Sequence, residues 1–253
     1  MWTWASILLI VGSYFLGGIP LQYLLAKLKG VNLSGEYDMH IALFRKVGPA
    51  LGIIGAVGDI TKGFIPIIIA NLTGMNTVIA ALAGLSVVTG QMWSIFNKFD
   101  GEKGNTTGIG MALALAPRGA AAMVIVIAIG AFTRTIPRLL KKGQTTRERL
   151  TFGGPPSNSL PIGMCIGFGL LPFVTTSLFS TWFGHPLATT LVATAMFVLV
   201  LLRRATADVK KDFSTGKSKT KIVLSRLLLD RSFYNVDPSQ KELGKQQEQL
   251  IEE

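Results

Sequence analysis

The chain has 253 residues, of which 49% are hydrophobic and only 15% charged, and its mean hydropathy is +0.46. These values exclude an ordinary soluble globular protein and are typical of integral membrane proteins. The formal net charge of +11 does not call for a nucleic-acid partner, because the basic residues fall between and after apolar segments. We therefore expect a single all-α transmembrane domain.

Apolar segments recur along the chain, at about 4–26, 49–71, 76–96, 105–116, 119–136, 159–182 and 185–203. A helix needs about 20 residues to cross about 30 Å of hydrocarbon. The segment at 105–116 is too short, so we expect a half-helix, or a helix that turns at Pro117 into the next segment. This pattern predicts about seven transmembrane helices within residues 1–203, the short helix included.

The basic residues predict the orientation, because Lys and Arg are retained on the cytoplasmic side of a membrane. With seven passes, all basic clusters lie on one face, and the opposite connections carry only Arg118. We therefore expect the N-terminus outside and the C-terminus in the cytoplasm. The clusters are Lys27 with Lys29, Arg45 with Lys46, Lys98 with Lys103, the group from Arg134 to Arg149, and the group from Arg203 to Lys221.

Two opposite charges, Asp59 and Lys62, lie three residues apart inside an apolar stretch. An ionisable side chain at membrane depth costs about 2.5 to 3.5 kcal/mol on insertion scales, so it usually faces the protein interior and finds a partner. Residues three apart share one face of a helix. We therefore expect Asp59 and Lys62 to form a structural intramembrane pair, with a role in chemistry as the alternative.

A glycine-rich loop precedes the short helix. It runs from Gly90 to Lys103 and Gly104, and Thr106 and Thr107 then open the helix. A glycine-rich turn beside a lysine and a helix N-terminus can bind an anion, because the backbone amides point outward and the helix dipole favours negative charge. By itself this pattern is weak evidence for a phosphate site.

Four motifs follow one another within residues 12–217. Asp59-Ile-Thr-Lys-Gly-Phe-Ile-Pro66 fits the pattern Asp-x-x-Lys-Gly-x-x-Pro at every fixed position. The others are Gly17-Gly-Ile-Pro20 with Tyr23-Leu-Leu-Ala-Lys27, Arg45 with Gly48, and Phe99-Asp-Gly-Glu-Lys-Gly-Asn-Thr-Thr107. Their order and spacing resemble those of the PlsY family, the bacterial membrane glycerol-3-phosphate acyltransferases that use acyl phosphate. The resemblance implies a PlsY-like helix bundle in the bacterial cytoplasmic (inner) membrane.

The family's phosphate loop, Gly-Ser-Gly-Asn-x-Gly-Ala-Thr-Asn, is altered. This chain reads Ser34-Gly-Glu-Tyr-Asp-Met-His-Ile-Ala42, so the small residues and both asparagines are gone. Glu36 and Asp38 add negative charge, and Tyr37 adds bulk. Because like charges repel, anion binding by this loop is expected to be disfavoured.

Two family histidines are also replaced. The family's Gly-His before the lysine loop is Gly90-Gln91, and the histidine and asparagine of its last motif align with Ala205 and Asp208. Neither Gln nor Ala can act as a general base near neutral pH. The substrate phosphate could still assist the reaction.

Six residues remain suited to bind a phosphate or a lipid headgroup. They are Arg45, Lys103, Thr106, Thr107, Ser157 and Ser159. If activity survives, Arg45 and Lys103 are the residues expected to act in catalysis. Lys and Arg at helix ends can equally mark topology alone.

The two histidines of the chain are His40 and His185. His40 lies near Asp38, where a base or a metal ligand can be imagined, but no further His or Cys supplies the spacing of a metal site. His185 starts the last apolar segment, where an interfacial position is the simplest explanation. We therefore expect no metal and no cofactor.

Residues 204–253 form a predicted cytoplasmic tail. Between Lys219 and Arg231, apolar residues alternate with basic ones, which suits a basic amphipathic helix at the inner membrane surface. After Pro238 the sequence is polar, and such an end could bind a soluble partner or be disordered.

The altered motifs favour one function over two others. Loss of the phosphate loop and both histidines favours a non-catalytic subunit, or a lipid-binding component, of a membrane protein complex, whose partners would be membrane lipids and other membrane protein subunits. The retained Arg45 and Lys103 support the alternative, an active enzyme that makes lysophosphatidate from acyl phosphate and glycerol 3-phosphate. A small transporter is the third hypothesis, since intramembrane charges and discontinuous helices occur there, but no repeat relates the two halves.

Overall fold

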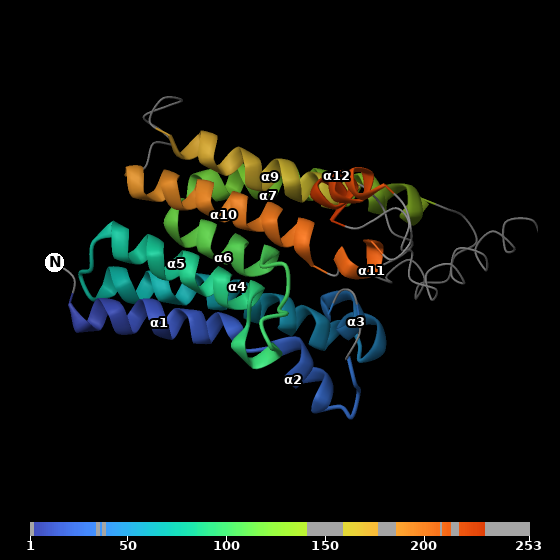
Figure 1. Cartoon of the computed structure of the whole chain (residues 1–253), viewed down its shortest axis with the longest axis horizontal. Helices are drawn as coiled ribbons and strands as arrows, with labels where there is room; N and C mark the ends of the chain where they lie inside the picture. The colour runs from blue at the N-terminus through green and yellow to red at the C-terminus, as the bar shows by residue number, and fades with distance from the viewer. Residues whose placement is uncertain are drawn as a thin grey trace, which may run out of the picture.

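The computed structural model of the chain describes residues 3–33, 36, 39–140, 159–176, 186–207, 209–213 and 218–230. Every regular element within these ranges is a helix. The long helices run side by side along the bundle, and the short helices α2, α3, α11 and α12 gather at one end (Figure 1). The helices are α1 Trp4–Gly18, α2 Leu21–Lys27, α3 Met39–Lys46, α4 Pro49–Leu72, α5 Thr77–Met92, η1 Ile95–Asn97, α6 Asn105–Leu115, α7 Pro117–Leu140, α9 Ser159–Thr175, α10 Leu187–Thr206, α11 Val209–Phe213 and α12 Lys219–Leu229.

The predicted apolar segments are mostly helical where the structure describes them. By length and composition, α4, the stretch Thr77–Asn97 and α10 can each cross a membrane, and the bent pair α1 and α2 adds a fourth span. Pro117–Thr133 and Ser159–Thr175 are apolar but shorter. The predicted half-helix is α6, which has 11 residues, and Pro117 begins the next helix as expected. The predicted orientation of the two termini stays a prediction.

The predicted apolar segment at 4–26 is not one straight helix, because the chain bends by 44° between α1 and α2. Pro20 has no N–H to continue the helical hydrogen bonds, and Ile19 before it takes an extended conformation. At the bend, two carbonyl oxygens accept hydrogen bonds from side chains of other segments. Lys62 Nζ donates to Ile19 O at 2.6 Å, and Ser94 Oγ donates to Gly18 O at 2.5 Å.

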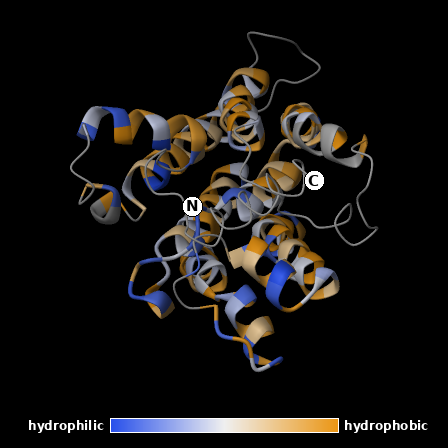
Figure 2. Ribbon diagram, turned by 90° about the vertical axis from the view of Figure 1, so that its right-hand side faces the viewer, coloured by the Kyte–Doolittle hydropathy of each residue, from blue (hydrophilic) through white to orange (hydrophobic). Residues whose placement is uncertain are grey.

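The outside of the bundle is apolar. Large hydrophobic side chains such as Ile53, Ile129 and Phe173 are more than half exposed. Viewed along the bundle, apolar residues lie on the outer faces of the long helices, and hydrophilic residues gather on the short elements at the near end (Figure 2). A helix bundle with this surface suits a hydrocarbon environment.

Glycines bring α4 and α6 into backbone contact. A Cβ on Gly63 would lie 2.0 Å from Thr107 O, and one on Gly110 would lie 1.9 Å from Ile60 O. Only glycine fits at such distances, and small residues at helix crossings are typical of membrane proteins. Gly63 belongs to the Asp59–Pro66 motif, so this motif fixes how α6 packs against Asp59.

The predicted amphipathic helix of the tail forms as α12 and packs on α10 and α9. Ile222 and Leu229 are buried on its inner face, as amphipathicity predicts, while Leu224 and Leu228 are half exposed. Arg226 differs from the expectation of an outward basic face. It is buried, it forms an ion pair with Asp212, and its Nε donates to Arg204 O at 3.1 Å.

Candidate active site

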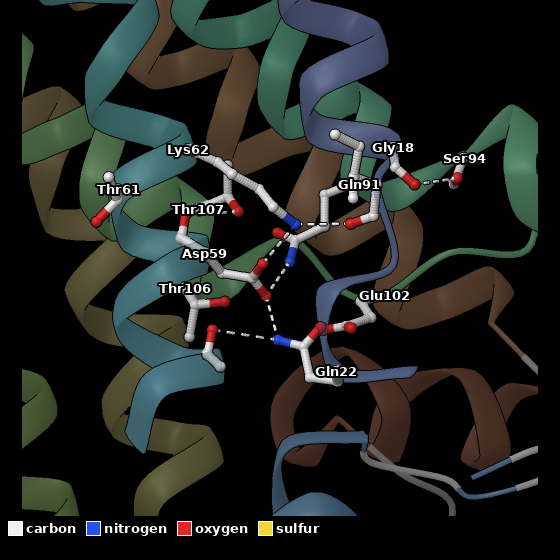
Figure 3. Close-up of polar contacts among 12 residues, drawn as sticks. Gly18, Gln22, Asp59, Thr61, Lys62, Gln91, Ser94, Glu102, Thr106 and Thr107 are labelled. Carbon is white, nitrogen blue, oxygen red and sulfur yellow. Dashed lines mark hydrogen bonds and ion pairs between the residues drawn. The ribbon is translucent and has the colours of Figure 1, made fainter. Parts of the chain in front are cut away.

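Asp59 is fully buried on α4 and is the centre of a polar cluster. Its Oδ1 accepts a hydrogen bond from Lys62 Nζ at 2.7 Å, so the predicted pair forms. Its Oδ2 accepts from Gln22 Nε2 at 2.5 Å and from Gln91 Nε2 at 2.7 Å. Figure 3 shows the ends of these side chains converging on the carboxylate from α2, α4 and α5. The site therefore contains more partners than the intrahelical pair that the sequence predicted.

Gln91 occupies one of the altered family positions, and the structure gives it a role. Its side chain is only 5% exposed, and its amide donates to the Asp59 carboxylate. A charged acceptor makes such a hydrogen bond stronger than a neutral one. Gln91 is therefore an integral part of the polar cluster rather than an inert replacement for histidine.

His40 joins this cluster from α3. Its Nε2 lies 3.3 Å from Asp59 Oδ2 and 3.1 Å from Glu102 Oε2, and the Oγ1 of Thr106 lies 3.3 Å away. The side chains of His40 and Glu102 are 24% and 21% exposed, whereas Asp59 is fully buried. The histidine thus connects a buried carboxylate with a half-exposed one, at a point that solvent or substrate can reach.

The two threonines at the start of α6 support this cluster. Thr107 is fully buried, and its Oγ1 donates to the backbone oxygen of Asp59 at 3.1 Å. Thr106 contacts His40. The hydroxyl groups of both contact protein partners, and their role as anion ligands stays a prediction.

A metal ion is a further possibility for this set of residues. The ligand atoms of His40, Asp59 and Glu102 lie within 4.8 Å of one another. However, the Asp59 carboxylate already accepts hydrogen bonds from the ammonium of Lys62 and from two amide groups. A cation would have to displace donors that point at the same oxygens. The geometry therefore suits proton transfer better than metal binding.

Lys103 follows Glu102 in the loop before α6, and it faces the C-terminal helix. Its Nζ lies 2.9 Å from Asp230 Oδ2. Arg203 anchors the same loop, because its guanidinium donates to the carboxylate of Asp100 and to the backbone oxygens of Gly101 and Glu102. The family lysine is thus present and held beside the cluster.

The other predicted phosphate ligands do not join the cluster in the described structure. Arg45 is exposed at the end of α3, and Ser159 is half-buried at the start of α9. Ser157 lies outside the described residues, as does His185.

The remaining altered positions are also accounted for. Glu36 forms an ion pair with Lys46, so its charge is matched locally. Ala205 is half-buried on α10. Tyr37, Asp38 and Asp208 lie outside the described residues. The expected repulsion of phosphate by Glu36 is therefore weakened by a neighbouring lysine.

Sequence reasoning missed the meeting of His40, Glu102 and Asp59. These residues belong to α3, to the loop before α6 and to α4, so no short-range spacing connects them. The one available signal was chemical. His40 and Glu102 are polar residues within segments that the family motifs already identified as one surface.

Comparisons with known proteins agree on one description. A family model described as glycerol-3-phosphate acyltransferase matches residues 7–212. A relative named glycerol-3-phosphate acyltransferase, from Geobacter metallireducens, is 41% identical over 115 residues, which are 44% of this chain and 59% of that protein. Glycerol-3-phosphate acyltransferase 4 from Dehalococcoides mccartyi is 28% identical over 232 residues, which are 89% of this chain and 88% of that protein. The chain thus spans about 60% of the length of several curated relatives it matches and most of the length of others.

Solved structures share the fold. The crystal structure of PlsY, an integral membrane glycerol 3-phosphate acyltransferase, in its glycerol 3-phosphate form has a TM-score of 0.62 and 22% identity. The matched region covers 84% of this chain and 93% of the PlsY chain. The lysophosphatidic acid form gives the same TM-score with 21% identity, and covers 87% and 98% of the two chains.

Proposed function

The chain belongs to the glycerol-3-phosphate acyltransferase family, and we propose that it transfers an acyl group from acyl phosphate to glycerol 3-phosphate, forming lysophosphatidate and inorganic phosphate. It is a multi-pass protein of the bacterial inner membrane with a PlsY-like helical fold. Membrane lipids are accordingly its expected surroundings.

The hypothesis of a non-catalytic subunit is contradicted. The family model, the relatives and the solved structures are all described as glycerol-3-phosphate acyltransferases, and none of them indicates a partner chain or a transporter. The hypothesis rested on the loss of side chains at aligned positions. It did not consider side chains that reach the same point from other elements.

The observation that carries the proposal is the position of His40 between two carboxylates. Glu102 and Asp59 both lie within 3.3 Å of His40 Nε2, and the ring is partly exposed. A general base must lie within hydrogen-bond reach of the proton that it removes, and carboxylates can fix its orientation. Because Nε2 carries the hydrogen that faces the two carboxylates, Nδ1 of His40 is the candidate acceptor of the hydroxyl proton of glycerol 3-phosphate.

The proposed reaction is one acyl transfer. The 1-hydroxyl oxygen of glycerol 3-phosphate forms a bond to the acyl carbon, and its proton passes to His40. The bond between the acyl carbon and the phosphate oxygen breaks, and inorganic phosphate leaves with the electron pair. Lys103, which adjoins Glu102, stabilises the negative charge, with Arg45 as a second candidate cation. Positioning of the two substrates supplies the rest of the rate enhancement.

An assay of the purified full chain tests this function. The protein in detergent is mixed with acyl phosphate and glycerol 3-phosphate, and lysophosphatidate is measured. We expect His40→Gln to lower kcat by about 10² to 10⁴, the usual contribution of general acid–base catalysis. His185→Gln serves as the matched control, because it changes the only other histidine of the chain.

Two results would count against the proposal in different ways. Absence of lysophosphatidate from well-folded wild-type protein would refute the acyltransferase activity. Product formation at an unchanged kcat in His40→Gln would leave the activity standing and would remove His40 from the mechanism.

A further inference from the structure

Arg204 on α10 is buried in an unusual way. Its side chain is fully buried, and its Nη1 donates to the backbone oxygens of Pro161 and Leu227 at 3.3 and 3.2 Å. Its Nε and Nη2, however, are buried without a hydrogen-bond partner. A buried charged group that lacks acceptors costs stability, so this guanidinium is suited to receive an anion.

Asp230 is the carboxylate that faces these donors. Its Oδ1 lies 3.9 Å from Arg204 Nε, which is too long for a hydrogen bond, while its Oδ2 lies 2.9 Å from Lys103 Nζ. One carboxylate therefore faces two cations, Lys103 and Arg204. It pairs with the first and leaves the Nε of the second without an acceptor.

A phosphoryl group matches this arrangement better than a carboxylate does. It carries up to two negative charges and three acceptor oxygens, and arginine binds such a group through a fork of donors. A phosphate between Lys103 and Arg204 could accept from both at once. The buried donors of Arg204 that have no acceptor would then gain one.

The position of Asp230 depends on α12. Asp230 caps this helix in a left-handed conformation, with φ of 62°, and its backbone N–H donates to Arg226 O at 2.8 Å. The helix itself is held by the ion pair between Arg226 and Asp212 and by the buried Leu229. Movement of the end of α12 would therefore withdraw the carboxylate from both cations.

We propose that Lys103 and Arg204 form a phosphate-binding site whose ligand competes with the Asp230 carboxylate, so that α12 closes the site when phosphate is absent. The ligand class is a phosphate monoester or inorganic phosphate. The inference rests on the proposed function only in taking Lys103 to lie beside the reacting groups. It adds Arg204 as a second cation and Asp230 as an internal competitor.

Binding of inorganic phosphate to the full chain in detergent, measured by calorimetry, tests the competition. We expect Asp230→Asn to bind phosphate about tenfold more tightly, because the competing charge is gone while the side-chain shape is kept. Lys103→Gln is expected to bind at least tenfold more weakly. Asp100→Asn is the matched control, since Asp100 is a mostly exposed carboxylate that pairs with the neighbouring Arg203, and its phosphate affinity is expected to equal that of wild type.

The same titration with glycerol 3-phosphate separates the two sources of the phosphoryl group. Tighter binding of both ligands by Asp230→Asn identifies a general phosphate site. Tighter binding of glycerol 3-phosphate alone identifies the acceptor substrate, and tighter binding of inorganic phosphate alone identifies the leaving group. Unchanged or weaker binding of both ligands would overturn the proposal.

Hydrogen exchange of the wild-type protein gives a second test that needs no variant. Saturating phosphate is expected to speed amide exchange at the C-terminal end of α12, because Asp230 is displaced. Unchanged or slower exchange there would overturn the displacement. Neither test measures acyl transfer. An inactive protein that binds phosphate as expected would therefore refute the proposed function and leave this inference intact.

Discussion

The buried pair of Asp59 and Lys62 should respond differently to loss of the carboxylate and to loss of the ammonium. The two side chains are 0% and 8% exposed and lie 2.7 Å apart. Removing one partner of a buried pair leaves the other charge uncompensated, which costs about 3 to 5 kcal/mol. In this protein, however, Asp59 has more hydrogen-bond partners besides this pair than Lys62 has. The two single substitutions should therefore differ in their cost to stability.

Asp59→Asn removes the charge that compensates the ammonium of Lys62 and leaves it only neutral acceptors, the new amide oxygen and the carbonyl oxygen of Ile19. We expect the full cost of about 3 to 5 kcal/mol, which corresponds to a fall in Tm of about 6 to 20 °C for a chain of this size. Lys62→Met leaves Asp59 with the amides of Gln22 and Gln91 as donors. We expect it to cost about 1.5 to 3 kcal/mol, the contribution of one hydrogen bond to a charged group.

Thermal unfolding of the full chain in detergent measures both substitutions and their combination. The double variant Asp59→Asn with Lys62→Met should be more stable than Asp59→Asn alone, because no buried ammonium remains. Glu36→Gln is the matched control: it breaks the more exposed pair with Lys46 and should cost at most about 1 kcal/mol. If Lys62→Met lowers Tm as much as Asp59→Asn does, the amide donors do not support Asp59 and the reasoning fails.

Two further predictions concern helix packing and the candidate active site. Gly63→Ala is expected to cost about 1 to 3 kcal/mol, because its methyl group would lie 2.0 Å from Thr107 O, whereas Gly12→Ala has open space within α1 and should not lower Tm. Equal Tm values for these two variants would contradict the close contact of α4 and α6. Glu102→Gln is expected to lower kcat for lysophosphatidate formation about tenfold or more without lowering Tm, and an unchanged kcat would remove Glu102 from the site.

The sequence predicted the elements whose causes are local. Apolar length predicted the helices, Pro117 predicted the boundary between α6 and α7, and the spacing of Asp59 and Lys62 predicted their contact. The bend after α1 could also have been predicted, because Pro20 inside an apolar segment removes a helical hydrogen bond. These features depend on residues a few positions apart along the chain.

The parts that the sequence did not predict depend on how separate elements pack. Arg226 was expected to face solvent or membrane, and it is buried because Asp212 of α11 and the backbone of α10 supply its acceptors. Lys103 was expected to bind a phosphate. In the structure it contacts Asp230, which lies 127 residues later in the chain. No local pattern connects such residues, so their contacts appear only when the helices are assembled.

The same reason weakens the argument from altered motifs to a non-catalytic protein. A family position describes one side chain on one helix, whereas Asp59 is reached from α2, α3, α4 and α5. Gln91 donates a hydrogen bond to the Asp59 carboxylate from α5, and His40 brings an imidazole to the same carboxylate from α3. Because several helices contribute to this site, the residue at one family position does not decide on its own which groups the site contains.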